Sequence, residues 1–347
     1  MMKKGVHIID PCTSDLWLRF VSDHPQASIF HHPVWMRMLR DTYDYKFFAV
    51  CQSDGENIVA GIPFADIRSM LTGKRWVSLP FSDFCRPLLP PDETDATEEL
   101  VEYLRPHLGR DVPKIEIRWD IKTTTQHYAD ASFVHHTLAL HGDADAVFKT
   151  FDKSKVQRDV RKAERDGIVV KRCSSLDDFL HFYRLQVTTR KRHGVPAQPL
   201  KFFKAVWEQI LQSGFGFATL AYKDDRLLGG AVFFHFGKTM YYKYGASDFS
   251  LKALHPNHAL LWDAIRNAST DGYTTFDFGR SEIENEGLRR FKNGWGTTES
   301  ALHYTVFSTD APKAGPSRMK GVMEAVIRNS PDFVCVLSGN VLYKHFA

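Results

Sequence analysis

The chain has 347 residues, which is too long for one ordinary domain and long enough to build two hydrophobic cores. Hydrophobic residues at 43% and charged residues at 25% are typical of a globular protein, and they exclude a disordered or collagen-like chain. A net charge of +4 is too small to indicate DNA as a partner.

Sequence features that bear on cellular location are consistent with one another. No apolar run reaches the roughly 18 to 20 residues that a membrane-spanning helix needs. The first residues include Lys3 and Lys4 but no apolar segment of the kind found in secretory signals. The five cysteines are scattered without paired spacing, which argues against a disulfide framework or a zinc ribbon. These features predict a cytoplasmic protein.

The first half of the chain predicts a helix, a hairpin, a second helix and a strand. Proline, turn residues and apolar periodicity mark their limits. The predicted elements are a helix from His32-Pro33, strands at 46–52 and 57–67, a helix after Pro91 and a strand at 114–120.

The second half repeats this order. Its predicted elements are helices at 176–192 and 200–211, strands at 216–222, 227–236 and 239–246, a helix at 257–270 and a strand at 274–278. The repeated order predicts a duplicated unit of the α/β (α+β) class, with mixed, mostly antiparallel sheets. We expect one domain at 1–145, a second at 146–310, and a helical segment at 311–347 that packs back on the protein.

The final segment begins with residues rich in Pro, Gly and Ser at 311–317. Apolar side chains then recur at helical spacing from Met319 to Ile327, and Pro331 ends the pattern. The simplest interpretation is a helix docked on the protein. Because Arg318, Lys320 and Arg328 share the other face, peripheral contact with an anionic membrane is the alternative.

Familiar chemical motifs are missing from the sequence. It contains no phosphate-binding P-loop, no Gly-x-Ser-x-Gly elbow, no zinc-protease motif and no dinucleotide-binding glycine motif. His255 and His258 form an i, i+3 pair, but no third metal ligand lies near them in the sequence. We therefore expect no metal and no tightly bound cofactor.

A basic segment at 153–165 predicts a phosphate-binding helix face. Its four stripe-forming cations are Lys155, Arg158, Arg161 and Arg165. At helical spacing they line one side, while Val156 and Val160 line another. Such a stripe can hold phosphates through charge-assisted hydrogen bonds. A solvated surface face is the alternative.

Three further segments carry candidate site residues. Residues 188–196 form a cationic helix end, with more charge than capping requires. Strand alternation predicts that Tyr242 and Tyr244 share one face, although tyrosines in a core are the simpler interpretation. The strand at 274–278 delivers Asp277 to its carboxyl end, and a short helix then presents Lys292 before a Gly-Trp-Gly turn.

The last segment resembles a known family. Gly-Leu-x-x-Phe-Lys-x-x-Trp-Gly, following Asp-Phe-Gly-Arg, is similar to the signature of the FemAB-like (Fem-type) proteins, which contain two domains similar to the GNAT acyltransferases. Ordered matches extend over most of the chain: His32-Pro33-x-Trp35, the Ser82-Asp83 loop, the basic helix to Gly167, Arg190-x-x-His193-Gly194-x-Pro196 and Tyr244-Gly245-Ala246. The resemblance implies tandem GNAT-like domains.

The resemblance also implies a function. The best-known members use aminoacyl-tRNA to add amino acids to the peptide of a cell-wall precursor. Lys292 with Phe291 would then lie at the acyl-transfer centre, Asp83 and Tyr244 would hold the acceptor, and Arg190 would bind its phosphates. The other residues expected to contact substrate are Trp35, Arg86, His193, Tyr242, Asn257, Arg280 and Asn285. The sequence lacks the long coiled-coil insertion that some members use to reach tRNA.

The chemistry expected at the centre is attack of an amine on an ester or thioester. A positive point charge such as Lys292 can stabilise the resulting oxyanion, and Asp277 or Asp83 can accept or orient the amine. The first alternative is an acyl-CoA-dependent N-acyltransferase acting on a small amine or sugar-amine. The glycine-rich loop that binds pyrophosphate in such enzymes is missing between Ser247 and His258. A non-enzymatic module that binds nucleotide-sugars or peptides is the second alternative.

Overall fold

The computed structural model describes residues 4–91, 94–309 and 318–345. The chain divides into two compact units, of which unit 1 comprises residues 1–133, 301–314 and 344–347 and unit 2 comprises residues 134–300 and 315–343. The domain boundary expected at 145/146 therefore lies inside unit 2. Residues 301–308, which the expected second domain included, belong to unit 1 and form most of a strand that was not predicted. Periodicity identifies a strand but not its pairing partner, so the sequence could not show this return.

Unit 1 is built on a mixed sheet whose strand order is β1-β2-β3-β4-β5-β12. The strands are β1 (Gly5–Ile9), β2 (Lys46–Ser53), β3 (Ile58–Ser69), β4 (Gly73–Val77), β5 (Lys114–Ile117) and β12 (Thr298–Ser308). β4 and β5 run parallel, whereas the other neighbouring pairs are antiparallel. The predicted hairpin at 46–67 corresponds to β2 and β3.

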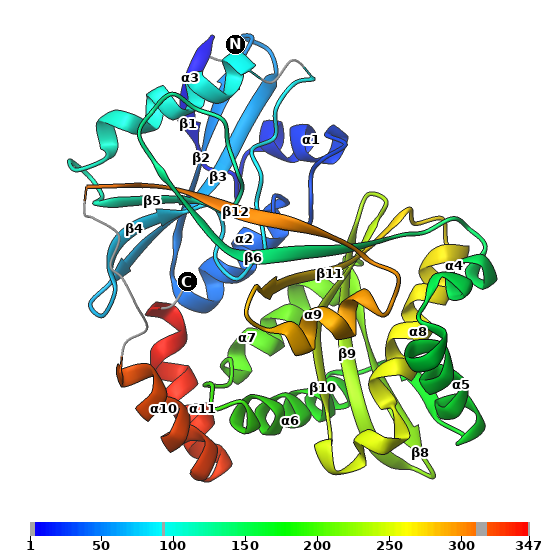
Figure 1. Ribbon diagram of the computed structural model, residues 1–347. Coiled ribbons are helices and arrows are strands. Elements are labelled where there is room, and N and C mark those ends of the chain that lie inside the picture. The colour runs from blue at the N-terminus through cyan, green and yellow to red at the C-terminus, as the bar shows by residue number, and fades with distance from the viewer. Residues whose placement is uncertain (1–3, 92–93, 310–317, 346–347) are drawn as a thin grey trace. The chain divides into compact units, whose positions relative to one another are not determined.

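Helices cover both faces of the unit 1 sheet (Figure 1). α3 (Thr94–Leu104) packs Leu100, Val101 and Leu104 against the apolar side chains of β2 and β3 on one face. α1 (Asp15–Asp23) and α2 (Pro33–Tyr43) contribute the buried Trp17 and other core side chains. A Cβ on Gly61 would lie 2.8 Å from the Trp17 ring, so this strand position requires glycine.

A buried histidine ties the segment before α2 to the loop that carries Asp83 and Arg86. The His31 side chain is fully buried. Its Nδ1 accepts a hydrogen bond from the backbone N–H of Ser28, and its Nε2 donates to the carbonyl of Arg86 at 2.8 Å. Burial lowers the pKa of His31 to about 4. The ring is therefore neutral at pH 7.

This buried histidine predicts sensitivity to acid. Between pH 6.5 and about 4, the unfolded chain protonates His31 and the folded chain does not, so stability should fall by up to about 3 kcal/mol as the pH is lowered through this range. In His31→Gln, urea unfolding at several pH values should show a smaller decline than in the unchanged protein. Exposed His127→Gln is the control. An unchanged decline in His31→Gln would contradict the assignment.

In unit 2 the strand order is β6-β11-β10-β9-β8-β7. The strands are β6 (Tyr128–Ala139), β11 (Thr275–Glu282), β10 (Thr239–Ser247), β9 (Arg226–Phe236), β8 (Gly216–Lys223) and β7 (Val169–Arg172). β10 and β11 are parallel, and β7 to β10 pair antiparallel in succession. The expected class of two α/β units with mixed, mostly antiparallel sheets is confirmed.

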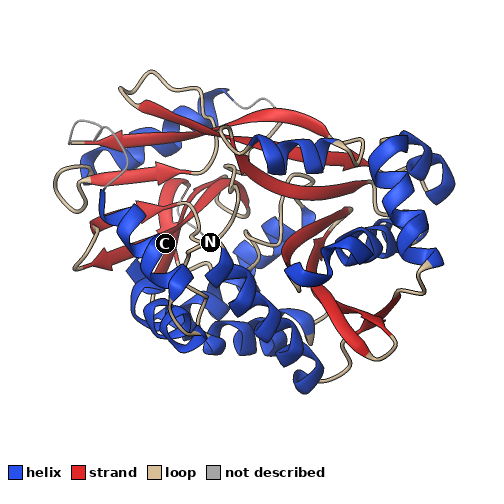
Figure 2. Ribbon diagram, turned by 60° about the horizontal axis from the view of Figure 1, so that its bottom comes forward, coloured by secondary structure: helices blue, strands red, loops and turns tan. Residues whose placement is uncertain are grey.

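Two helical layers cover the sheet of unit 2 (Figures 1 and 2). On one face α4 (Ala144–Thr150), α5 (Arg158–Arg165) and α8 (Pro256–Thr270) pack against side chains that include Phe233 and Phe276. α6 (Leu176–Arg192) and α7 (Leu200–Ala205) bring Phe182 and Phe203 to the opposite side, where Phe203 meets Tyr244. Strand alternation places neighbouring side chains on opposite faces, which explains the two cores.

The expectation that Tyr242 and Tyr244 share one face is wrong. The pairing of β10 with β9 shifts register between these two residues. Tyr242 consequently packs on Phe233 and Phe278, whereas Tyr244 packs on Phe203. A β-bulge inserts one extra residue and breaks the alternation.

The carboxyl-terminal segment forms α10 (Arg318–Asn329) and α11 (Asp332–Leu342), which are grouped with unit 2. The predicted linker at 311–317 lies outside the described residues, and α11 was not predicted. A Cβ on Gly339 would lie 1.7 Å from the carbonyl oxygen of Ala197, so α11 can approach this backbone only through glycine. Among the described helices, none has the length and apolar character needed to cross a bilayer.

Candidate functional site

The centre of the candidate site is a turn of the backbone inside strand β11, at Gly279 and Arg280. Phe276 and Phe278 are buried in the core beneath α8, so alternation directs Asp277 to the opposite face. Asp277 is buried, and its Oδ1 accepts a hydrogen bond from the backbone N–H of Gly279 at 2.6 Å. Gly279 has a φ of 69°, a conformation that glycine adopts without strain. Asp277 therefore caps this turn.

Lys292 reaches the same turn from α9 (Glu286–Asn293). Its Nζ donates to the carbonyl of Gly279 at 3.1 Å and to the carbonyl of Arg280 at 2.8 Å. The residue is only 5% exposed, so its charge is held inside unit 2. Leu288 on the same helix is exposed, because α9 places its lysine side against the turn.

A histidine that the sequence reasoning missed completes this arrangement. His135 Nε2 lies 2.9 Å from both carboxylate oxygens of Asp277. The two side chains are 12% and 4% exposed. His135, Asp277, Gly279 and Lys292 thus form one connected group within unit 2. Sequence periodicity does not point to His135, because β6 has no regular alternation of apolar and polar residues.

The neighbouring His136 faces the other way. Its Nδ1 lies 3.1 Å from Asn293 Oδ1, and its Nε2 lies 3.9 Å from Glu299. Burial, and next the positive charge of Lys292, lowers the pKa of His136 to about 4. His136 is therefore neutral at pH 7, and Glu299 pairs with Arg289.

Most of the other predicted substrate contacts of unit 2 lie in different surroundings. Arg190 donates to the carbonyl of Pro196 and to the Tyr343 hydroxyl at 2.7 Å, so it attaches the chain end to α6. Asn285 is exposed and caps α9 by accepting from the N–H of Leu288. The structure places the rest as follows: His193 exposed beside Arg192, Tyr242 and Tyr244 on opposite faces, Asn257 at the start of α8, and Arg280 in the turn with Lys292.

The three predicted residues of unit 1 differ in accessibility. Trp35 is fully buried and packs on Phe30, so in this structure it contributes to the core and does not face a substrate. Asp83 and Arg86 are half-buried on one loop. The backbone carbonyl of Asp83 accepts from the Tyr304 hydroxyl, and the Arg86 guanidinium stacks 4.7 Å from the centre of the Trp119 ring.

The basic stripe has the predicted orientation. Lys155, Arg158, Arg161 and Arg165 are exposed, and Val156 and Val160 are buried in the core of unit 2. A π-helical turn at Lys153–Gln157 precedes α5. Arg158 pairs with Asp159, and Arg161 lies over the Phe148 ring. Lys155 and Arg165 have no ion pair among the described contacts, so the stripe retains positive charge that can bind an anion.

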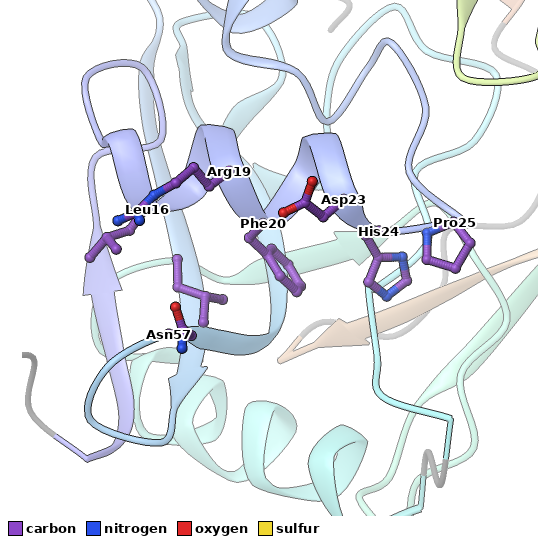
Figure 3. Close-up of a pocket in the computed structure, with 8 residues that line it drawn as sticks. Leu16, Arg19, Phe20, Asp23, His24, Pro25 and Asn57 are labelled. Carbon is purple, nitrogen blue, oxygen red and sulfur yellow. The ribbon is translucent and has the colours of Figure 1, made fainter.

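Each unit has a surface hollow that no residue of the Lys292 group lines. In unit 1, a cavity of about 370 Å³ is lined by α1 side chains, including Arg19, Phe20 and Asp23, which project toward the loop carrying Asn57 (Figure 3). In unit 2, a cavity of about 380 Å³ lies between α6 and the residues after β10, beside Arg192 and Phe249. None of the predicted site residues lines either cavity.

The chain resembles known proteins in both sequence and fold. Residues 85–214 match the FemAB family, and residues 152–293 match the acetyltransferase (GNAT) domain. A lipid II:glycine glycyltransferase of Staphylococcus epidermidis is 37% identical over 76 residues, which cover 20% of this chain and 18% of that protein. A protein of the same name from Staphylococcus aureus matches equally. The chain thus matches less than one fifth of the length of these relatives.

Solved structures show the same fold at low sequence identity. FemX superposes with a TM-score of 0.67 at 16% identity, covering 83% of this chain and 94% of FemX. L-PGS from Bacillus licheniformis superposes with a TM-score of 0.53 at 13% identity, covering 84% of this chain and 90% of that chain. At such identities, the likeness concerns the fold.

Proposed function

The chain belongs to the FemAB-like proteins with two GNAT-like units, and from this premise we propose that it transfers an aminoacyl group from aminoacyl-tRNA to an amine of a cell-envelope precursor. The observation that carries the proposal is the buried Lys292 ammonium at the turn formed by Gly279 and Arg280. Aminoacyl transfer is also the activity named for the glycyltransferases that the chain resembles.

The proposed chemistry follows from the charge and burial of Lys292. Attack of the acceptor amine on the donor ester forms a tetrahedral intermediate with a negatively charged oxygen. A fixed cation with little exposure to water stabilises that oxygen more than a solvated cation would, because the local dielectric is low and no reorientation is needed. The two carbonyls hold the ammonium in place before the reaction begins.

The acceptor amine must lose a proton as the new amide bond forms. The His135–Asp277 pair lies on the same turn as Lys292 and supplies a candidate proton acceptor. Collapse of the intermediate breaks the ester bond, and the 3′-hydroxyl of the tRNA leaves with a proton. The chemistry requires no metal at Lys292, and no tightly bound cofactor is proposed.

The proposal is tested by direct transfer with the purified full chain. Radiolabelled glycyl-tRNA, other aminoacyl-tRNAs and acetyl-CoA are each offered as donors, with lipid II or a UDP-linked muropeptide as acceptor. We expect labelled acceptor with an aminoacyl-tRNA donor. Transfer from acetyl-CoA alone would replace the proposal by the CoA-dependent function, which the GNAT match over 152–293 favours. Acceptor binding without transfer from any donor would favour a binding module.

The basic stripe gives a second prediction about the donor. Replacing Arg158, Arg161 and Arg165 together by Gln should weaken binding of charged tRNA and reduce the slope of its salt dependence, because fewer counterions are released. Binding is measured by filter retention between 50 and 300 mM salt. A triple replacement of Lys201, Lys204 and Lys238 by Gln removes the same charge elsewhere in unit 2 and serves as the control. Equal loss in both variants would contradict a specific role for the stripe.

A further inference from the structure

A carboxylate and two imidazoles converge where α5 meets the start of α8. Asp159 lies on α5, and His255 and His258 lie at the amino end of α8. Their ligand atoms are all within 4.8 Å of one another. The sequence-based expectation of no metal rested on the lack of a third ligand near the two histidines. The fold supplies that ligand from a distant part of the chain.

From this geometry we propose that Asp159, His255 and His258 bind a divalent transition metal ion of the Zn²⁺ type. Zn²⁺ takes imidazole nitrogen and carboxylate oxygen at about 2.0 to 2.2 Å, so tetrahedral ligand atoms are about 3.3 Å apart. Asp159 Oδ2 lies 3.3 Å from His255 Nδ1 and 3.8 Å from His258 Nε2. Small side-chain rotations bring all three atoms onto one ion.

Neighbouring groups orient the proposed ligands. Arg158 contacts Asp159 Oδ1 at 2.9 Å through both Nε and Nη2, and Oδ2 is the oxygen turned toward the two histidines. The His258 ring stacks on the fully buried Trp295, with ring centres 5.6 Å apart, and meets the edge of Phe291. Such outer contacts fix ligand orientation in known metal sites.

The local charge also suits a metal. The positive charge of Arg158 repels a bound metal ion, but the Asp159 carboxylate lies between Arg158 and the proposed metal position. Lys162, the other nearby cation, is held by Asp166 and by the carbonyl of Ala253.

Three protein ligands leave a fourth position on a tetrahedral ion. Catalytic and substrate-binding zinc sites have this composition, whereas structural zinc sites use four protein ligands. The fourth position can hold water or a phosphate oxygen. The basic stripe runs beside this site, since Arg158 belongs to the stripe and also contacts Asp159. The metal site does not depend on the proposed transferase activity.

The test is direct titration of the full chain with ZnCl₂ by calorimetry, after treatment with EDTA and removal of the chelator. We expect one ion per chain with a dissociation constant of roughly 1 µM or below. His255→Gln and Asp159→Asn should each weaken binding by more than tenfold, since loss of an outer-shell partner alone costs about 10- to 100-fold. His141→Gln, which changes an exposed histidine of the same unit, should not alter it.

Binding of Co²⁺ gives a second test, which does not depend on the calorimetric affinity. Co²⁺ bound to the unchanged protein should show visible absorption of a low-coordinate ion, and His258→Gln should remove it. Circular dichroism establishes that each variant is folded. If the unchanged chain binds no Zn²⁺, or if binding survives all three substitutions, the proposal is overturned and the three residues form only a hydrogen-bonded cluster.

Discussion

Replacing Lys292 with methionine should lower the single-turnover rate of acyl transfer about a hundredfold or more. This is the scale observed when a group that stabilises an oxyanion is removed. Methionine keeps the length and apolar stem of the side chain but loses the charge. The substitution should also lower the free energy of unfolding by about 1 to 3 kcal/mol, because the carbonyls of Gly279 and Arg280 lose their donor in a buried setting.

Arg289→Met is the control that separates the effect of Lys292→Met on the transfer rate from its effect on stability. Arg289 lies on the same short helix and donates to the carbonyl of Ile283 and to Glu299. Its loss should destabilise α9 without removing charge from the turn. Rates are measured by rapid quench well below the unfolding midpoint of each variant. Near-normal transfer by Lys292→Met, or an equal rate loss in Arg289→Met, would assign Lys292 a structural role only.

The elements that sequence reasoning predicted well are those with strong local signals. α6 begins at the Ser175 capping box, and α8 begins at Pro256, so both helices have limits that are visible in the sequence. β8 and β9 are apolar runs joined by the turn residues Asp224 and Asp225. The two-unit architecture followed from the repeated order of such elements.

What the sequence could not predict depends on contacts between distant residues. His135 pairs with Asp277 across 142 positions, on a strand without clear alternation. Asp159 joins His255 although neither segment alone forms a metal motif. The bulge at Tyr242 reverses the side-chain order that strand periodicity predicts. The burial of Lys292 is set by the carbonyls of another element, and helix periodicity does not show them.

Replacing Asp277 with asparagine should lower the unfolding free energy by about 2 to 3 kcal/mol and slow acyl transfer at least tenfold. The side chain is buried, and one oxygen accepts from Gly279 N–H while both face His135. Asparagine keeps the shape but replaces one acceptor with a donor and removes the charge. Because the Gly279 carbonyl accepts from Lys292, a change in this turn also moves the lysine.

The pH dependence of the rate distinguishes two roles for Asp277. If Asp277 only positions the turn, Asp277→Asn should lower the rate by the same factor at every pH. If the His135–Asp277 pair accepts the amine proton, the substitution should instead remove or shift the acidic limb of the pH–rate profile. Asp277→Asn, His135→Gln and the double variant form a double-mutant cycle. Because the two side chains are in contact, their effects on the free energy of unfolding should differ from additivity by more than about 0.5 kcal/mol. Additive effects on unfolding would contradict the observed pairing, because residues that share a buried contact do not contribute independently.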